Sequence, residues 1–285
     1  MKRLSLVILA IIGVTLIFGP FVLIWVGRSK LHNSDINKKD ELIPEMPKRR
    51  VLAFFPHPDD EITVAGTLLK LKASGHEIYL VVLTKGEAGN SPENYSKERL
   101  AQIRVGELEE SARCLKVDEL HLLDYSDGGL KALGLDSLKA VAQMWIDRIQ
   151  PDVLISYDSK VGLYGHDDHR LTGLAMESLF LEKNGQIDFT PNQLFQVTLS
   201  PKQIEVALQL SEGFQKNYPK DRERGLPKAD FSVDVQSVFS TKLQAMKSHY
   251  SQRMVFKDLM PYHDQIPAVI YSRIFDREYF HEVKK

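Results

Sequence analysis

Strand-like and helix-like stretches alternate from residue 50 onward, and this alternation limits the possible folds more than any other feature. Val51–Phe55 and Ile78–Leu83 are near-continuous apolar runs, as expected for parallel strands covered on both faces. Residues 61–74 and 96–115 have apolar side chains at helical spacing. With two further units, four strand–helix units precede residue 150. The sequence therefore predicts an α/β fold, a Rossmann-like, doubly wound, mostly parallel sheet.

The rest of the chain continues this pattern less regularly. We expect further strands at 119–123, 153–157, 194–199, 231–235 and 268–275, and further helices at 136–149, 168–181, 201–212 and 237–249. Residues 231–235 are expected to form an edge strand, and residues 268–275 the final strand. Everything from residue 49 to residue 285 is predicted to be one catalytic domain.

The first thirty residues differ from the rest. After a short tail (residues 1–3), residues 4–27 carry no charge, and at 1.5 Å per residue they would span about 36 Å as a helix. A cleaved signal peptide would have a shorter apolar region followed by small residues, whereas this run ends in Ile24–Trp25–Val26. We therefore expect a single-pass membrane anchor and, over residues 28–48, a polar linker. Basic residues flank the run on both sides, so the side of the membrane stays undecided.

The composition narrows the function classes. The 37 basic and 38 acidic residues nearly cancel, so nothing in the overall charge favours binding to nucleic acid. The single cysteine, Cys114, excludes an intramolecular disulfide.

A cluster of polar residues follows the first strand of the domain. His57, Asp59, Asp60 and Glu61 come directly after Val51–Phe55, at a strand end where α/β proteins place chemistry. Acids also favour the first turn of a helix, which would explain the carboxylates without a site. That alternative leaves His57 unexplained.

A second cluster follows a later strand. His166 and His169 are three residues apart and can share one helical face. Together with a carboxylate and a histidine from elsewhere, one of them would complete a set of three ligands and leave coordination positions open. Such a set suits a catalytic metal ion better than a closed structural one.

These motifs resemble the PIG-L/LmbE family of metal-dependent de-N-acetylases, which remove acetyl groups from N-acetylglucosamine-type sugars. The resemblance rests on His57–Glu61, on Thr84–Glu87 and on His166–His169, and it covers roughly residues 50–255. Further matches are Arg104 with Glu107, Asp127–Gly128, Tyr164, and the spacing of Lys242, Ala245, His249, Ser251 and Gln252. Two positions depart from the family pattern: Pro56 replaces a small residue, and Asp167 replaces a proline. Asp167 is expected to raise the pKa of His166.

The resemblance implies a set of roles. His57, Asp60 and His169 would bind one divalent ion, usually Zn²⁺, although Fe²⁺ also accepts two histidines and one carboxylate. Asp59 would be the general base for a metal-activated water. His166, oriented by Asp168, would be the acid or oxyanion stabiliser, and Tyr164 an extra donor to the same oxygen.

Three further residues are expected to contact the substrate: Arg104, Asp127 and Glu87. The alternatives are a structural arginine and a simple turn carboxylate. With the predicted anchor, the fold would be LmbE-like, preceded by one transmembrane helix, and the substrate a lipid-linked or otherwise conjugated N-acetylated amino sugar. A metal-dependent phosphoesterase, which usually needs two metal ions, and a non-catalytic glycan-binding protein are the competing hypotheses.

Overall fold

One mixed sheet forms the centre of the protein. The computed structural model describes residues 2–284, and for residues 2–12, 14, 15 and 222 it describes the backbone alone. Within this part of the chain, the strands of the sheet are β1 (Asn37–Lys39), β2 (Arg50–Phe55), β3 (Glu77–Thr84), β4 (Glu119–Tyr125), β5 (Val153–Ser156), β6 (Gln193–Thr198), β7 (Phe231–Asp234) and β8 (Arg277–Glu282).

The strand order is β1-β7-β8-β6-β5-β2-β3-β4. The strands from β6 to β4 are parallel to their neighbours, and only β8 runs antiparallel, to β6 and to β7. The predicted mostly parallel, doubly wound α/β sheet is therefore confirmed. Because the chain continues from β2 to β3 on one side while β5 pairs on the other, the order reverses at β2, and this is where α/β folds bind ligands.

Twelve α-helices occur among the described residues, with short 3₁₀ turns η1 (Asp60–Val64), η2 (Arg222–Arg224), η3 (Gln236–Val238) and η4 (Tyr250–Gln252) between them. The helices are α1 (Lys2–Leu31), α2 (Ala65–Ala73), α3 (Lys97–Leu115), α4 (Leu130–Leu133), α5 (Leu135–Ile149), α6 (Gly162–Gly165), α7 (Asp167–Lys183), α8 (Pro201–Leu210), α9 (Glu212–Asn217), α10 (Phe239–Ser248), α11 (Arg253–Leu259) and α12 (Ala268–Ile274).

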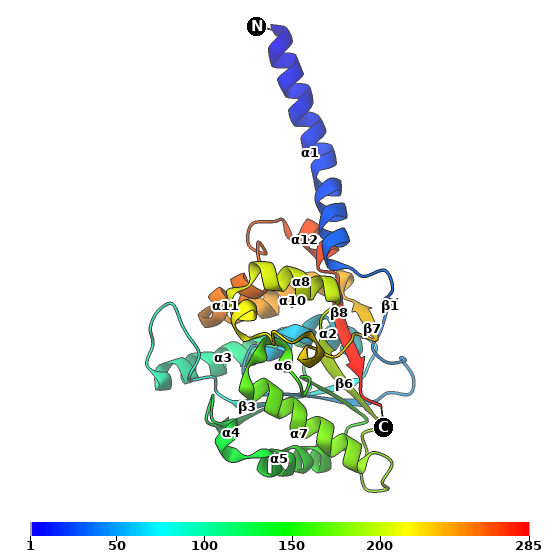
Figure 1. Cartoon of the computed structure of the whole chain (residues 1–285), viewed down its shortest axis with the longest axis vertical. Coiled ribbons are helices and arrows are strands. Elements are labelled where there is room, and N and C mark those ends of the chain that lie inside the picture. The colour runs from blue at the N-terminus through cyan, green and yellow to red at the C-terminus, as the bar shows by residue number, and fades with distance from the viewer. Residues whose placement is uncertain (1, 285) are drawn as a thin grey trace.

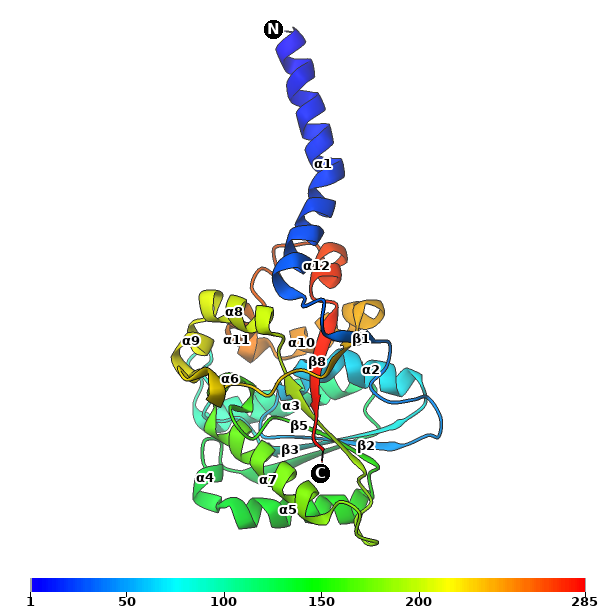
Figure 2. The same cartoon turned by 45° about the vertical axis from the view of Figure 1, so that its right-hand side comes forward.

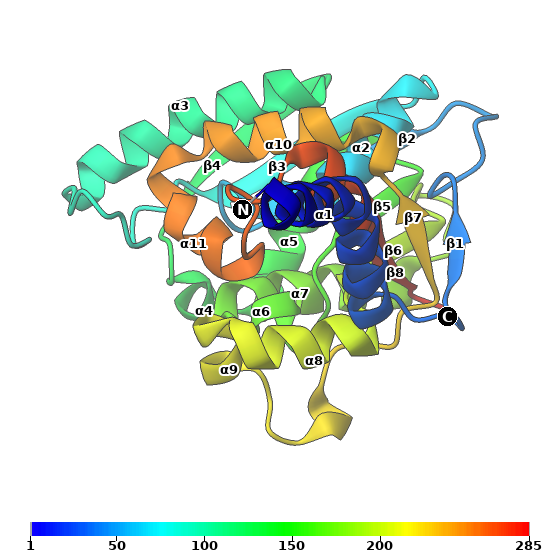
Figure 3. The same cartoon turned by 90° about the horizontal axis from the view of Figure 1, so that it is seen from above.

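The two faces of the sheet carry separate hydrophobic cores. Val51, Ala53 and Phe55 of β2 pack on the side of α2, α3 and α10, whereas Leu52 and Phe54 pack on the side of α5 and α7. This alternation follows from the two-residue period of a strand. Figure 3 shows α3 and α10 side by side along one side of the sheet. The layers bury every residue of β2 after Arg50 and so hold its carboxyl end in a fixed place.

Two expected elements differ from the structure at the C-terminal end of the sheet. Residues 268–274, expected as the last strand, form helix α12, and the last strand is β8. A short apolar run cannot be assigned to strand or helix by periodicity alone, and Pro267 at the N-cap favours the helix. Strand β7 is not at the edge either, because β1 pairs with it on its outer side.

The segment 28–48, predicted to be a linker, is partly built into the domain. Its residues 37–39 form β1, and Leu31, Ile36, Leu42 and Ile43 are buried. Four buried apolar side chains are enough to pack this segment on the domain. Because they are dispersed among charged residues, the composition of the segment is typical of a linker.

The predicted membrane anchor over residues 4–27 must also be corrected. A long helix, α1, does form and projects from the domain (Figures 1 and 2). Within the part of the chain that is described, however, none of the helices combines the length and apolar character that a membrane span requires. The last turns of α1 instead dock on the domain: Arg28 pairs with Asp276 at 3.3 Å, and Lys202 donates to the Ser29 carbonyl at 2.7 Å.

Candidate functional site

The site forms where the carboxyl ends of β2, β3, β4 and β5 meet. After β2 the chain turns at Pro56, whose carbonyl accepts hydrogen bonds from the backbone N–H and the hydroxyl of Thr84, at the end of β3, each at 2.9 Å. His57 follows immediately and is buried. Its own N–H donates to the Asp60 carboxylate at 2.7 Å. The two residues are thereby fixed to one another before any ligand is considered.

Three side chains bring potential metal ligands to one point. Nδ1 of His57 lies 3.0 Å from Nε2 of His169. The Asp60 carboxylate lies 3.6 Å from the former nitrogen and 3.3 Å from the latter. These are the residues for which the resemblance implied metal binding. The structure brings them together from β2 and α7, more than a hundred positions apart in the sequence.

Hydrogen bonds on the far sides of the two rings direct lone pairs into this point. Nδ1 of His169 lies 3.1 Å from the Gly162 carbonyl, which can only accept, so that nitrogen carries the proton and Nε2 is free. Nε2 of His57 faces Asp127 at 2.9 Å and Asp168 at 3.3 Å, so a proton belongs there and Nδ1 is the nitrogen left for a metal ion. Such outer partners fix the tautomer of histidines that bind metals.

The electrostatics also favour a cation at this point. Burial acts to lower the pKa of His57, but its hydrogen bonds to Asp127 and Asp168 raise that pKa to about 10. Burial raises the pKa of Asp60 to about 7. Burial and the neighbouring histidines hold the pKa of His169 well below its usual range, so its Nε2 stays unprotonated. The raised pKa of His57 means that its Nδ1 holds a proton at neutral pH. A divalent ion bound between this nitrogen, Nε2 of His169 and the Asp60 carboxylate would displace that proton.

Among the described residues, two other sets of side chains lie close enough together to hold a metal ion. One set is His57, His166 and His169, and the other is His57, Asp127 and Asp168. In the second group the contacts are already explained as hydrogen bonds on Nε2 of His57.

Asp59, the expected base, has an unusual backbone conformation. Its φ of 101° lies in the left-handed region, which is uncommon for a residue with a side chain. Its carboxylate lies 3.1 Å from Arg104 and is 15% exposed. Burial raises the pKa of Asp59, against the opposing charge of Arg104.

Arg104 does not have the exposed position that a substrate contact would favour. The guanidinium is buried, pairs with Asp59 and donates to the carbonyls of Gly86 (2.8 Å) and Pro58. A side chain on Gly86 would collide with it, and Gly86 has a φ of +69°. The glycine of the loop after β3 is therefore explained by the arginine that lies against it.

Asp127 and Glu87 also differ from the expectation of substrate contacts. Asp127 accepts from His57 and from the Ala88 N–H, at 2.9 Å in both cases, and these bonds lower its pKa to about 2 although burial acts to raise it. Glu87 accepts from the Asp127 N–H at 2.8 Å. Both carboxylates thus tie the loops after β3 and β4 to each other and orient His57.

The relation between Asp168 and His166 is not the expected one. The Asp168 carboxylate accepts from the N–H groups of Gly128 (2.8 Å) and Leu130 (3.3 Å) and faces His57. Its backbone N–H, rather than its carboxylate, contacts His166: it donates to Nδ1 at 3.2 Å, so that His166 caps helix α7.

This cap determines which nitrogen of His166 can donate. Because Nδ1 accepts a bond, the proton of the neutral ring lies on Nε2, and His166 is exposed at the rim of the site. Loss of hydration and the proximity of His57 lower the pKa of His166. The prediction that the pKa of His166 is raised is therefore wrong. Asp167 does act to raise this pKa, but its effect is smaller than those of burial and of His57.

Two tyrosines, Tyr157 and Tyr164, lie against the ring of His169. Tyr164 is half-buried, and burial raises its pKa, so its O–H stays protonated. Tyr157 was not predicted as a site residue. It stacks on His169 with ring centroids 4.4 Å apart and donates to Asp60 at 2.8 Å. Tyr157 follows β5 directly, as Pro56–His57 follows β2, and this position at a strand end could have indicated that it belongs to the site.

Asp158 shapes the loop that holds His169. Its buried carboxylate accepts from the N–H groups of Lys160 (2.9 Å), Val161 (2.7 Å) and Leu163 (2.9 Å). This loop supplies the Gly162 carbonyl that orients His169. The only feature of the sequence that indicates this role is the position of Asp158 at a strand end.

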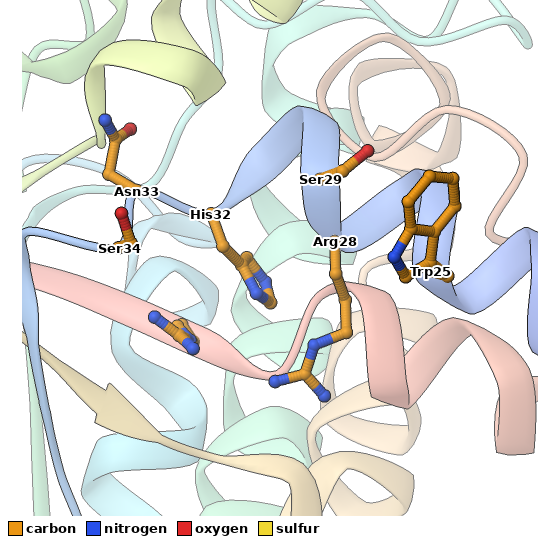
Figure 4. A pocket seen from close by; sticks show the side chains of 7 residues that line it. Trp25, Arg28, Ser29, His32, Asn33 and Ser34 are labelled. Atoms are coloured by element: carbon orange, nitrogen blue, oxygen red, sulfur yellow. The ribbon is translucent and has the colours of Figure 1, made fainter.

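A separate surface cavity of about 370 Å³ lies where α1 meets the domain. Figure 4 shows Trp25, Arg28, Ser29 and His32 around it, with Asn33 and Ser34 on the following loop. None of the predicted site residues lines this cavity, so the candidate chemistry lies elsewhere.

Comparison with known proteins agrees with the resemblance. The model of a family described as "PIG-L: GlcNAc-PI de-N-acetylase" matches residues 52–180. The diacetylchitobiose deacetylase of Thermococcus kodakarensis is 30% identical over 206 residues, which cover 72% of this chain and 70% of the relative. A 1D-myo-inositol 2-acetamido-2-deoxy-alpha-D-glucopyranoside deacetylase of Thermomonospora curvata is 26% identical over 245 residues, covering 73% and 82% of the two chains.

A solved structure supports the fold. The N,N'-diacetylchitobiose deacetylase of Pyrococcus horikoshii superposes with a TM-score of 0.61 at 24% identity, covering 86% of this chain and 87% of the other. At that identity the likeness concerns the fold, which is the mostly parallel sheet described above.

Proposed function

Because the chain belongs to the PIG-L family of metal-dependent de-N-acetylases, we propose that it hydrolyses the acetamide of an N-acetylglucosamine-type sugar joined to a second polyhydroxylated ring. The named relatives act on a disaccharide and on an inositol glycoside, which share this chemistry. The expectation of a lipid-linked substrate depended on the membrane anchor and is not kept.

One observation carries the proposal: Nδ1 of His57, Nε2 of His169 and the carboxylate of Asp60 converge on one point. These residues would hold a divalent cation, for which we propose Zn²⁺ because nitrogen and carboxylate ligands suit it. When bound, such an ion polarises a carbonyl and lowers the pKa of water to about 7.

The chain's own residues supply the proton transfers. Asp59 would accept the proton of the attacking water, and burial helps because it raises the pKa of the Asp59 carboxylate. His166 would donate its Nε2–H to the acetyl oxygen, where negative charge develops. The C–N bond then breaks, acetate leaves, and the amine nitrogen takes up a proton. Tyr164, which stays protonated, is a second donor at this side.

The experiment is an assay of free-amine release from N,N'-diacetylchitobiose by the full chain. We expect activity that is lost after chelation and recovered with Zn²⁺. Asp59→Asn should keep its metal content and lose about 10²–10⁴-fold in kcat, the usual contribution of a general base. Full activity of Asp59→Asn, or activity insensitive to chelation, would contradict the mechanism.

The alternative of a metal-dependent phosphoesterase has one observation in its favour. His57, Asp127 and Asp168 could contribute to a second ion site, and two-metal sites are common in phosphoryl transfer. Metal analysis separates the two: one ion per chain supports the deacetylase, two ions the phosphoesterase. Sugar binding without any turnover would point to the glycan-binding alternative.

A further inference from the structure

The left-handed turn at Asp59 needs a partner that holds it. Conformations of this kind are strained and persist where the surroundings enforce them. Here the backbone N–H of Asp59 donates to Oε2 of Glu61 at 3.0 Å, two residues further on. Arg104 holds the other end of the residue, the carboxylate. The direction of the expected base therefore depends on where Glu61 lies.

Glu61 is itself held by residues far away in the sequence. It is fully buried, and its Oε1 accepts from Nε2 of His249 at 2.6 Å and from the hydroxyl of Ser111 at 2.5 Å. His249 is equally buried. A carboxylate removed from water in this way is stable only when hydrogen-bonded and paired, and both conditions are met. Burial acts to raise the pKa of Glu61, but His249 and Ser111 lower it, so the group stays ionised.

The segment that carries His249 is anchored independently of Glu61. Ser251 donates its N–H and its hydroxyl to Glu107 of α3, each at 2.7 Å. Helix α10, which ends one residue before His249, packs along α3 (Figure 3). His249 is thus presented to Glu61 by an element from the last third of the chain, with a fixed support of its own.

We propose that Glu61 and His249 are positioning residues for the reaction: together they hold the Asp59 turn so that its carboxylate faces the reacting water. The inference rests on the proposed function, since it assigns the pair a role in the placement of that base. Neither residue reaches the point where His57, Asp60 and His169 converge. Both should act on the rate through Asp59 and leave metal binding in place.

The test uses the full chain with Glu61→Met, which removes the acceptor for the Asp59 N–H at similar volume. We expect kcat to fall by about 10²-fold, the effect of misplacing a catalytic group by about 1 Å. KM and the metal content should stay near the wild-type values, because substrate and metal contacts are untouched. Glu61→Gln keeps an acceptor for that N–H and should restore most of kcat. His249→Gln, whose amide can donate at the place of Nε2, should fall in between.

Ser248→Ala is the matched control. It removes an exposed hydrogen bond to the Gln244 carbonyl at the end of α10, next to His249 but without contact to Glu61 or Glu107, and should leave kcat unchanged. A purely structural role for the pair predicts instead that all variants lose stability and metal content together, with the remaining folded protein fully active. That result would overturn the inference, as would wild-type kcat in metal-loaded Glu61→Met.

A crystal structure of Glu61→Met keeps the inference separate from the proposed function. We expect Asp59 to leave its positive φ and its contact with Arg104. If it retains both, the positioning role is wrong even in a protein that deacetylates sugars. If wild-type protein releases no amine while the Asp59 turn still collapses in the variant, the proposed substrate fails and the positioning role stands.

Discussion

At the scale of single residues, the site depends on which nitrogen of each histidine carries a proton. Strand ends and the histidine spacing indicated the two clusters that contain residues 57, 60 and 169, whereas the choice of these three as ligands was implied by the resemblance to the family. The histidine tautomers could not be predicted, because they depend on the Gly162 carbonyl and on Asp127 and Asp168. Arg104, Asp127 and Glu87 were predicted to contact the substrate. In the structure they contact other protein groups, and no sequence pattern indicates the direction of a side chain.

His166 can be tested without disturbing its role as a helix cap. His166→Asn keeps a side-chain oxygen for the Asp168 N–H, since asparagine is a good N-cap, but removes the Nε2–H donor. We expect kcat to fall by about 10²–10³-fold, as for the loss of one oxyanion donor, with an unchanged melting temperature. Amine-release kinetics and thermal unfolding measure the two. A variant with normal kcat would contradict the assigned donor.

Tyr157 should affect the metal rather than the rate. Tyr157→Phe keeps the ring stacked on His169 and removes the hydrogen bond to Asp60. Loss of such an outer partner typically weakens metal affinity by about 10–100-fold. Competition with a chelating indicator would measure this, and kcat at saturating metal should change little. Unaltered affinity would mean that the hydroxyl does not tune Asp60.

At the scale of elements, regular pieces were predictable and irregular ones were not. Strands β2 to β6 were expected within a few residues, because long apolar runs leave little choice. The turns that form the site were not, since they depend on residues with left-handed backbone such as Asp59, Gly162 and Leu163. The strand expected at 268–275 is a helix, as short apolar runs fit either element.

The turn before α7 offers a test with a built-in control. Gly162 has a φ of +67°, and a Cβ there would collide with His169, whereas Gly185 has a φ of +89° with open space around it. Alanine at either position costs about 1–2 kcal/mol for the left-handed backbone. Only Gly162→Ala should also weaken metal binding. Denaturant unfolding and metal titration compare the two variants, and equal metal affinity would show that the turn does not position His169.

At the scale of the whole molecule, the mostly parallel sheet and its two-sided core were predicted from the alternation of strands and helices, whereas the strand order and the structure of residues 28–48 were not. Residues 28–48 looked like a linker because few of them are apolar. Yet β1 closes the outer edge of the sheet, and α1 docks through Arg28 and Ser29. Such long-range pairings join segments with weak local signals, so they could be found only in the structure.

The buried pair of Glu61 and His249 should also give the folded protein a characteristic pH dependence. The pKa of Glu61 is lowered from 4.5, so its contribution is present above pH 4.5 and disappears as the pH falls through the folded value. The pKa of His249 is raised from 6.5, chiefly by Glu61 against the effect of burial. Its contribution is complete below pH 6.5 and disappears as the pH rises through the folded value.

The stabilisation by the pair should therefore be greatest between these two limits. We expect the difference in unfolding free energy between wild type and a Glu61→Gln/His249→Gln double variant to be largest between about pH 4.5 and 6.5. Denaturant unfolding at fixed metal saturation measures it. A difference that is constant from pH 4 to pH 9 would show that the pair is uncharged.

Anomalous diffraction from zinc-loaded crystals of the full chain tests whether His57, Asp60 and His169 form one metal site. We expect a single zinc peak about 2.0–2.1 Å from Nδ1 of His57 and from Nε2 of His169, with an Asp60 oxygen as the third ligand. A peak between Nε2 of His57, Asp127 and Asp168, or no peak at this point in active protein, would contradict it.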